Sequence, residues 1–154
     1  MNLITLQDEL ANDEGIKYET YNCSLGHLTG GIGHLITEWD IEYYDKPIGT
    51  KVPNEQVNDW FESDIKTTIK DCKLLFSQFD DLPDEIQLVL ANMCFQLGRP
   101  RLSKFKKMIA AVENLDWSSM ADEMHDSTWR WQTPERAQRL ISRVEKQMIS
   151  EIPT

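Results

Sequence analysis

The spacing of apolar residues changes along the chain, and each change predicts a different element. Leucines recur at helical spacing over residues 2–12, so a first helix is predicted there, ending before Gly15. Apolar and polar residues then alternate over residues 16–21, which predicts a strand. The run LTGGIGHL predicts a second strand after a turn near residues 24–26. A hairpin or a small three-stranded sheet is therefore expected after the first helix.

The rest of the chain carries helical patterns. A long helix with one broad apolar stripe is predicted over residues 53–75. A last helix is predicted to begin with Thr133 as its N-cap and Pro134 as its first residue. Between them, helices are predicted over residues 84–97, 103–113 and 117–125.

These elements predict an α+β fold with two lobes in one domain, residues 1–154. The β-rich lobe is expected over about residues 15–52, and the helix over 53–75 joins it to a helical lobe over 76–150. The N-terminal helix, 2–12, is assigned to the helical lobe. A cleft between two lobes is a common place for a ligand site.

Composition removes several classes of function. No apolar run approaches the roughly 20 residues that span a bilayer, and the N-terminus lacks the pattern of a signal peptide, so a cytoplasmic protein without membrane insertion is expected. Three cysteines without CxxC spacing indicate neither a disulfide framework nor a zinc site. We expect no metal and no organic cofactor.

Charge is distributed unevenly along the chain. The net charge is −10, and residues 1–90 hold 18 acidic and 6 basic side chains, whereas residues 91–154 hold 8 acidic and 10 basic ones. So acidic a chain is a poor candidate for nonspecific binding of nucleic acid. The second part can present a locally basic face to an anionic ligand, or its charges can be scattered and solvated.

Three polar side chains near the predicted hairpin are candidates for chemistry. Glu14 lies where the first helix ends, and a partly buried carboxyl facing a cleft can serve as a general acid, although a glutamate at a helix end is also a common surface charge. Cys23 is by default a small buried hydrophobe. Thr29 could hold a water molecule that Cys23 helps to orient, although strands favour threonine anyway.

The glycines that follow have a different interpretation. Gly30, Gly31 and Gly33 do not form a GxGxxG pattern and do not lead into a helix, so a phosphate-binding loop is a poor reading. Glycines there allow the backbone to approach a ligand or a neighbouring lobe closely. His34 is interpreted as a hydrogen-bonded core histidine.

Glu14, Cys23 and Thr29, within DEG and TGGIGHL, have the spacing of the active-site signature of the phage-type lysozymes, glycoside hydrolase family 24, which the chain resembles. ANMCFQLG at residues 91–98 and WRWQTPERAQR at 129–139 resemble two further blocks of that family. The blocks occur in the family's order and cover nearly the whole chain. The resemblance implies a lysozyme-like fold and bacterial peptidoglycan as the substrate.

The resemblance also implies roles for these residues. Glu14 would protonate the leaving oxygen of the β-1,4 bond between N-acetylmuramic acid and N-acetylglucosamine, and Arg136 would pair with Glu14 and hold it. Thr29 would position the attacking water. Cys23 occupies the second catalytic position, where a carboxylate is usual. Its role as a thiolate base, a hydrogen-bonding partner or an electrostatic element stays open.

Other residues match supporting positions of the family. Leu35 and Phe95 would line the sugar-binding cleft, although Phe95 as plain core is an equal alternative. Gln96 and Asn92 are secondary candidates on the same helix. His34 would form an ion pair with Asp64, while Gly31 and Gly33 would support the site. Met108 and Glu123 match cleft positions that usually carry serine and asparagine.

The function implied by the resemblance is that of an endolysin-type muramidase. Such an enzyme would be a monomer that accumulates in the cytoplasm of its host and reaches the cell wall after the membrane is permeabilised. Because cell walls are anionic, binding by this acidic chain would depend on its basic second part and on salt. The alternatives are a noncatalytic wall-binding module with the same fold and a glycosidase that acts on chitin-like polymers.

Overall fold

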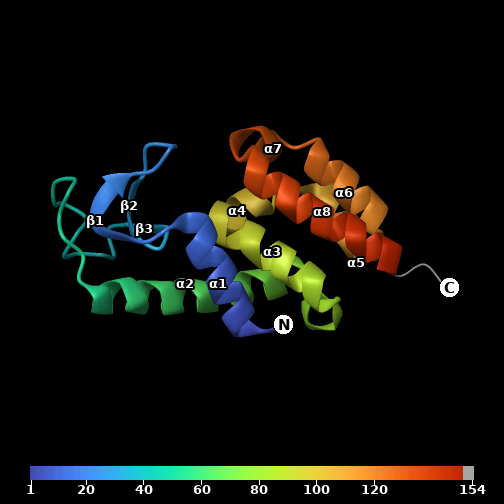
Figure 1. Cartoon of the computed structure of the whole chain (residues 1–154), viewed down its shortest axis with the longest axis horizontal. Coiled ribbons are helices and arrows are strands. Elements are labelled where there is room, and N and C mark those ends of the chain that lie inside the picture. Colours follow the sequence, from blue (N-terminus) through green and yellow to red (C-terminus); the bar gives the residue numbers. More distant parts are fainter. Residues whose placement is uncertain (151–154) are drawn as a thin grey trace. The chain divides into compact units, whose positions relative to one another are not determined.

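The computed structural model describes residues 1–150, with eight α-helices and a three-stranded antiparallel sheet in that range (Figure 1). This composition confirms the predicted α+β class. The chain forms two compact units, one of residues 7–67 and one of residues 1–6 together with the chain from Thr68 onward. Helices α1 (Leu3–Glu14) and α2 (Asn54–Leu75) each contribute to both units.

The smaller unit contains the sheet, whose strand order is β1-β2-β3. The strands are β1 (Lys17–Asn22), β2 (Leu28–Gly31) and β3 (His34–Leu35). The run LTGGIGHL was predicted as one strand and instead forms two strands with a turn between them. Gly31 and Gly33 have φ angles of +61° and +62°, a backbone conformation that reverses the chain and that side chains disfavour.

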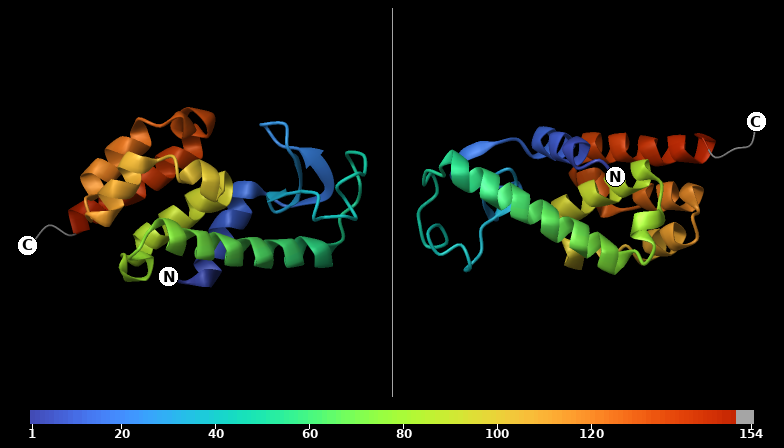
Figure 2. Two further views of the ribbon diagram at one scale, coloured as in Figure 1. Left: turned by 180° about the vertical axis from the view of Figure 1, so that it is seen from behind. Right: turned by 90° about the horizontal axis from the view of Figure 1, so that it is seen from below.

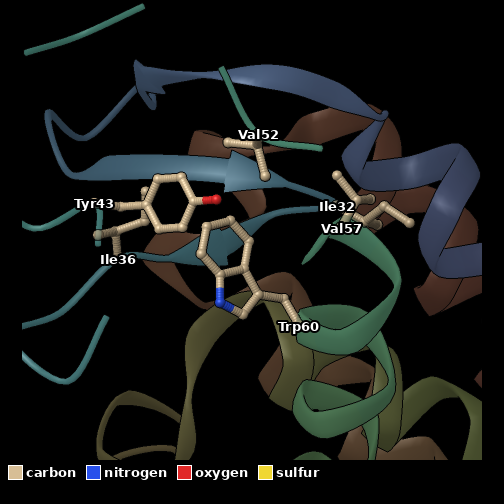
Figure 3. Packing of buried hydrophobic residues seen from close by; sticks show 6 residues of the cluster. All are labelled: Ile32, Ile36, Tyr43, Val52, Val57 and Trp60. Carbon is tan, nitrogen blue, oxygen red and sulfur yellow. The ribbon is translucent and has the colours of Figure 1, made fainter. Parts of the chain in front are cut away.

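A compact apolar cluster holds the sheet against the first turns of α2. Figure 3 shows the indole ring of Trp60 among side chains of the turn between β2 and β3, of the segment that follows β3 and of α2 itself. The cluster consists of Ile32, Ile36, Tyr43, Val52, Val57 and Trp60, each at most 7% exposed. Burial of this apolar surface is the main stabilising contribution in the unit. It also holds the backbone of β2 and β3 in place.

The larger unit is a bundle built around α3. Ten of the 14 residues of α3 are buried, so the helix has no solvent-facing stripe and occupies the centre. α8 packs against both α3 and α6, and α6 also packs against α5 (Figures 1 and 2). The helices of this unit are α3 (Asp84–Leu97), α4 (Arg99–Leu102), α5 (Lys106–Glu113), α6 (Trp117–His125), α7 (Thr128–Gln132) and α8 (Pro134–Ser150).

The helix bounds agree with the sequence pattern except at two places. The helix predicted over residues 103–113 begins only at Lys106, and a separate turn of helix, α4, precedes it. Phe105, with ψ of +56°, breaks the helical path between them. α7 was not predicted; the Ser127 side chain accepts a hydrogen bond from the amide of Arg130 and caps its start. Within residues 1–150, no helix is long and apolar enough to cross a membrane.

Candidate active site

Glu14 is the last residue of α1. The next residue, Gly15, has a φ of +73° and donates its amide hydrogen to the carbonyl of Ala11 over 3.0 Å, which closes the helix. The chain then turns directly into β1. The half-buried carboxyl of Glu14 is therefore fixed at the junction between a helix and a sheet.

The turn between β2 and β3 lies against this carboxyl. A Cβ atom built on Gly33 would lie 2.5 Å from Oε1 of Glu14 and 2.9 Å from its Cδ. Real side chains do not tolerate such a contact, so a methyl group at position 33 would displace the carboxyl. The absence of a side chain at Gly33 thus leaves the space that the carboxyl of Glu14 occupies.

Cys23 begins the turn between β1 and β2, where its amide donates to the carbonyl of His27 over 2.9 Å. Its thiol is free and half-buried. Burial acts to raise the pKa of Cys23. The backbone amides of His27, Leu25 and Gly26 can donate hydrogen bonds to the sulfur, as can the Thr29 hydroxyl when it turns away from the carbonyl of His27, and together they lower this pKa below its usual value. The turn therefore stabilises a thiolate at a position where the family usually has a carboxylate.

Thr29 lies on β2 and is only 5% exposed. Its Oγ1 donates a hydrogen bond to the carbonyl of His27 over 2.8 Å and is also a hydrogen-bond partner of Cys23. A hydroxyl has a single proton, so Thr29 donates either to that carbonyl or to a thiolate at Cys23. The protonation state of Cys23 and the direction of the Thr29 hydroxyl are therefore coupled.

Tyr21 belongs to this group, although the sequence analysis did not select it. The pairing of β1 with β2 places Tyr21 opposite Thr29. Burial raises the pKa of Tyr21, and the negative charges of Glu14 and then Cys23 raise it further. Its phenol consequently stays protonated beside both groups and can donate a hydrogen bond. Only the register between β1 and β2 could have indicated that Tyr21 belongs to the site, because nothing in the local sequence distinguishes it from other strand residues.

His34 forms the ion pair with Asp64 that the resemblance implies, and it has a second acidic partner. Its Nδ1 lies 2.7 Å from Oδ2 of Asp64, and its Nε2 lies 3.0 Å from Oδ2 of Asp40. The ring stacks on Trp60 with 4.3 Å between centroids. Burial acts to lower the pKa of His34, but both carboxylates favour the cation, first Asp64 and then Asp40, and the pKa is raised. Sequence analysis did not find Asp40, which lies in a segment without helical or strand periodicity.

Leu35 lies on β3, and Gly31 lies on β2, the strand that carries Thr29. Leu35 is opposite Thr29 in the β2–β3 ladder, and its side chain is 52% exposed, so it can contact a ligand beside that hydroxyl. A Cβ atom on Gly31 would lie 3.4 Å from the Trp60 ring. Gly31 therefore permits close packing of β2 on the apolar cluster.

The larger unit holds the other predicted residues. Arg136 on α8 is buried, and its Nε donates to Oδ1 of Asn92 on α3 over 2.9 Å. Gln96, one helical turn further along α3, accepts a hydrogen bond from Nε1 of Trp129 over 2.9 Å. Phe95 is half-buried, and this burial fits both a residue of the core and a residue that lines a cleft. The pairing of Arg136 with Glu14 stays a prediction.

Met108 and Glu123, which come from different helices, line one pocket of about 660 Å³ in the larger unit. The Met108 side chain is buried beneath it, and the indole of Trp129 forms another part of its wall. Because both residues match family cleft positions, the pocket is a candidate for part of the ligand site. Within residues 1–150 there is no group of three or more histidine, cysteine or acidic side chains that could hold a metal ion.

Comparisons with known proteins identify lysozymes and a peptidoglycan hydrolase as relatives of this chain. The family model described as phage lysozyme matches residues 11–147. The chain is 34% identical over 165 residues to "Probable T4-type lysozyme 2" of Dictyostelium discoideum, covering 96% of this chain and 97% of that relative. It is 33% identical to "Probable T4-type lysozyme 1" of the same organism, with 92% and 94% covered. It is also 28% identical to "Peptidoglycan hydrolase gp36" of Pseudomonas phage phiKMV, covering 88% of this chain and 14% of that protein.

Proposed function

Because this chain belongs to the phage lysozyme family, we propose that it is a muramidase that hydrolyses the β-1,4 bond between N-acetylmuramic acid and N-acetylglucosamine in peptidoglycan. The chain is a lysozyme-type glycoside hydrolase. The observation that carries the specific proposal is that the charges of Glu14 and Cys23 both act on the phenol of Tyr21, which pairs across the sheet with Thr29.

Glu14 acts as the general acid in this proposal. Breaking a glycosidic bond requires a proton on the departing oxygen, and a carboxyl is the usual donor in glycoside hydrolases. The carboxyl occupies the space left by the missing side chain of Gly33, beside the turn between β2 and β3, and this placement supports the role because proton transfer depends on the position of the donor. The protonated phenol of Tyr21 contributes a further hydrogen-bond donor beside it.

Cys23 and Thr29 hold the attacking water. A thiolate at Cys23 accepts a proton or a hydrogen bond from that water, and the lowered pKa of Cys23 favours this form. Thr29 completes the arrangement, because its hydroxyl can turn between the sulfur and the carbonyl of His27. The arrangement thus supplies a proton donor and a water-orienting pair, which are the parts that hydrolysis needs.

The cellular role that fits this activity is that of an endolysin. The protein would act as a monomer, stay in the cytoplasm of a bacterial host until the membrane is permeabilised, and then degrade the cell wall. A noncatalytic wall-binding module is the alternative, and a glycosidase of chitin-like polymers is another.

Clearance of peptidoglycan suspensions tests the proposal. The intact chain should clear purified walls and leave chitin oligomers uncut, while Glu14→Gln should lose activity by about 100-fold or more because it has no proton to donate. Cys23→Ser replaces the thiol by a hydroxyl, which can still orient water. Because the variant cannot form a thiolate, an intermediate rate is expected. Failure of the folded wild-type chain to clear walls across a range of salt and pH would favour the binding module.

A further inference from the structure

Part of the lining of the pocket in the larger unit is strongly basic, and its four cationic residues are called the basic wall below. Arg101, Lys104, Lys106 and Lys107 all line it, and the three lysines are exposed. Arg101 lies in α4, Lys104 in the short segment after it, and Lys106 and Lys107 in the first turn of α5. Four cationic side chains within seven consecutive residues make this wall the natural place for an anion.

These lysines are not neutralised by the protein. Within residues 1–150, no carboxylate lies within ion-pair distance of the ammonium groups of Lys104, Lys106 or Lys107. Glu123 and Asp126 line another part of the pocket, but they do not reach these ammonium groups. The basic wall therefore keeps its positive charge even though the chain as a whole is acidic.

The placement of two of these lysines is unfavourable unless an anion is present. Lys106 and Lys107 occupy the first turn of α5, and that turn contains no acidic residue and no capping side chain. Helix N-termini carry a partial positive charge, which disfavours cations there and favours anions. A carboxylate bound in the pocket would compensate both the lysines and the helix terminus.

We propose that this pocket binds the free carboxylates of the peptides attached to peptidoglycan, so that the chain prefers peptides with free carboxylates to amidated ones. The proposal rests on the proposed function, because that function supplies peptidoglycan as the ligand. Phe105, Met108 and Trp129 also line the pocket and supply apolar contacts for the attached peptide and sugar. The charged wall then distinguishes a carboxylate from a carboxamide of nearly the same shape.

A matched pair of ligands tests this preference. N-acetylmuramoyl-L-alanyl-D-glutamate and its D-isoglutamine form differ only in whether one carboxylate is amidated. Each is titrated into the intact chain while backbone amide signals are followed by NMR, and signals of residues 105–108 should shift. The acid form should bind about 3- to 10-fold more tightly, since each exposed charge pair contributes modestly. Equal affinities, or no binding of either ligand, would overturn the proposal.

Substitutions test whether the basic wall is responsible for the preference for the acid form. The double variant Lys104→Gln/Lys107→Gln should reduce binding of the acid form by about 3- to 10-fold and reduce the preference with it. Lys70→Gln/Lys146→Gln makes the same change in net charge at exposed positions outside the pocket lining and should leave the preference intact. Asp126→Asn removes a negative charge from the lining and should tighten binding of the acid form. If both double variants weaken binding equally, the effect is one of net charge and the pocket is not the site.

Wall clearance by the same protein separates this inference from the proposed function. A chain that clears walls but does not distinguish the two ligands retains the muramidase assignment and loses the pocket assignment. A chain that distinguishes the ligands but does not clear walls retains the carboxylate pocket and loses the muramidase assignment.

Discussion

The imidazole of His34 and the carboxylate of Asp64 lie 2.7 Å apart, and they connect β3 to α2 within the smaller unit. Asp40 approaches the other ring nitrogen, so the histidine is held between two acids. Because Thr29 and Gly33 lie on or beside strands that pair with β3, this contact also stabilises the backbone around the candidate site.

Replacement of His34 should cost stability in a pH-dependent way. The pKa of His34 is raised in the folded chain, so the paired cation stabilises the fold fully below the unfolded pKa of about 6.5, and this stabilisation is lost as pH rises through the folded pKa. Denaturation of His34→Asn should show a loss of about 1 to 3 kcal/mol at about pH 5.5, and a smaller loss at about pH 9.

His27→Asn is the matched control for this experiment. His27 is an exposed histidine of the same unit, and its side chain makes no ion pair within residues 1–150. Its replacement should change stability little at either pH. An equal loss for His34→Asn at both pH values would show that packing against Trp60, and not the ion pairs, is the main contribution.

Substitution of Gly33 should separate activity from stability. Alanine at position 33 places a methyl group against the carboxyl of Glu14 and also strains a backbone with φ of +62°. Gly49 has a φ of +92°, and a Cβ atom there would meet only Oε2 of Glu19 at an ordinary contact distance of 3.7 Å, so Gly49→Ala has the backbone cost alone. We expect both variants to lose about 1 to 2 kcal/mol of stability, whereas wall clearance should fall only for Gly33→Ala. Normal clearance by Gly33→Ala would show that the exact position of the Glu14 carboxyl matters little.

The thiol of Cys23 should react at lower pH than an ordinary cysteine. Its lowered pKa predicts that the rate of alkylation by iodoacetamide rises with a midpoint at lower pH than for a cysteine in an unstructured peptide measured alongside. Thr29→Val removes one donor to the sulfur and should move this midpoint upward. Cys72 and Cys94 are buried, and a hydrogen bond with Cys94 together with burial raises the pKa of Cys72 strongly, so both should react only after unfolding. A rapid reaction that persists in Cys23→Ser would contradict this assignment.

The contact between Arg136 and Asn92 should be measurable as a coupling. Arg136→Met removes the donor to Oδ1 of the fully buried Asn92, which should cost about 1 to 3 kcal/mol in chemical denaturation. Asn92→Ala should cost less in the Arg136→Met background than alone. Arg139→Met, at an exposed position of the same helix, should cost less than about 1 kcal/mol. Additive effects of the two buried substitutions would mean that this hydrogen bond contributes nothing to stability.

Local patterns in the sequence were sufficient for most of the helices. α3 and α6 begin and end where the apolar spacing, the prolines and the glycine predict, because helix signals act over a few neighbouring residues. The candidate catalytic residues were also visible, since the spacing of Glu14, Cys23 and Thr29 is a property of the linear sequence. Such features need no knowledge of which distant segments meet.

Tertiary structure decided the features that depend on residues far apart in sequence. The split of LTGGIGHL into two strands depends on the packing of Gly31 against Trp60, and the role of Asp40 depends on a loop that returns to His34. Neither contact follows a local period, because the apolar cluster and the ion pairs join segments that only folding brings together. The sequence alone thus determined most of the helices and the reactive groups, whereas long-range packing determined the strand boundaries, which side chains surround those groups and what charge they carry.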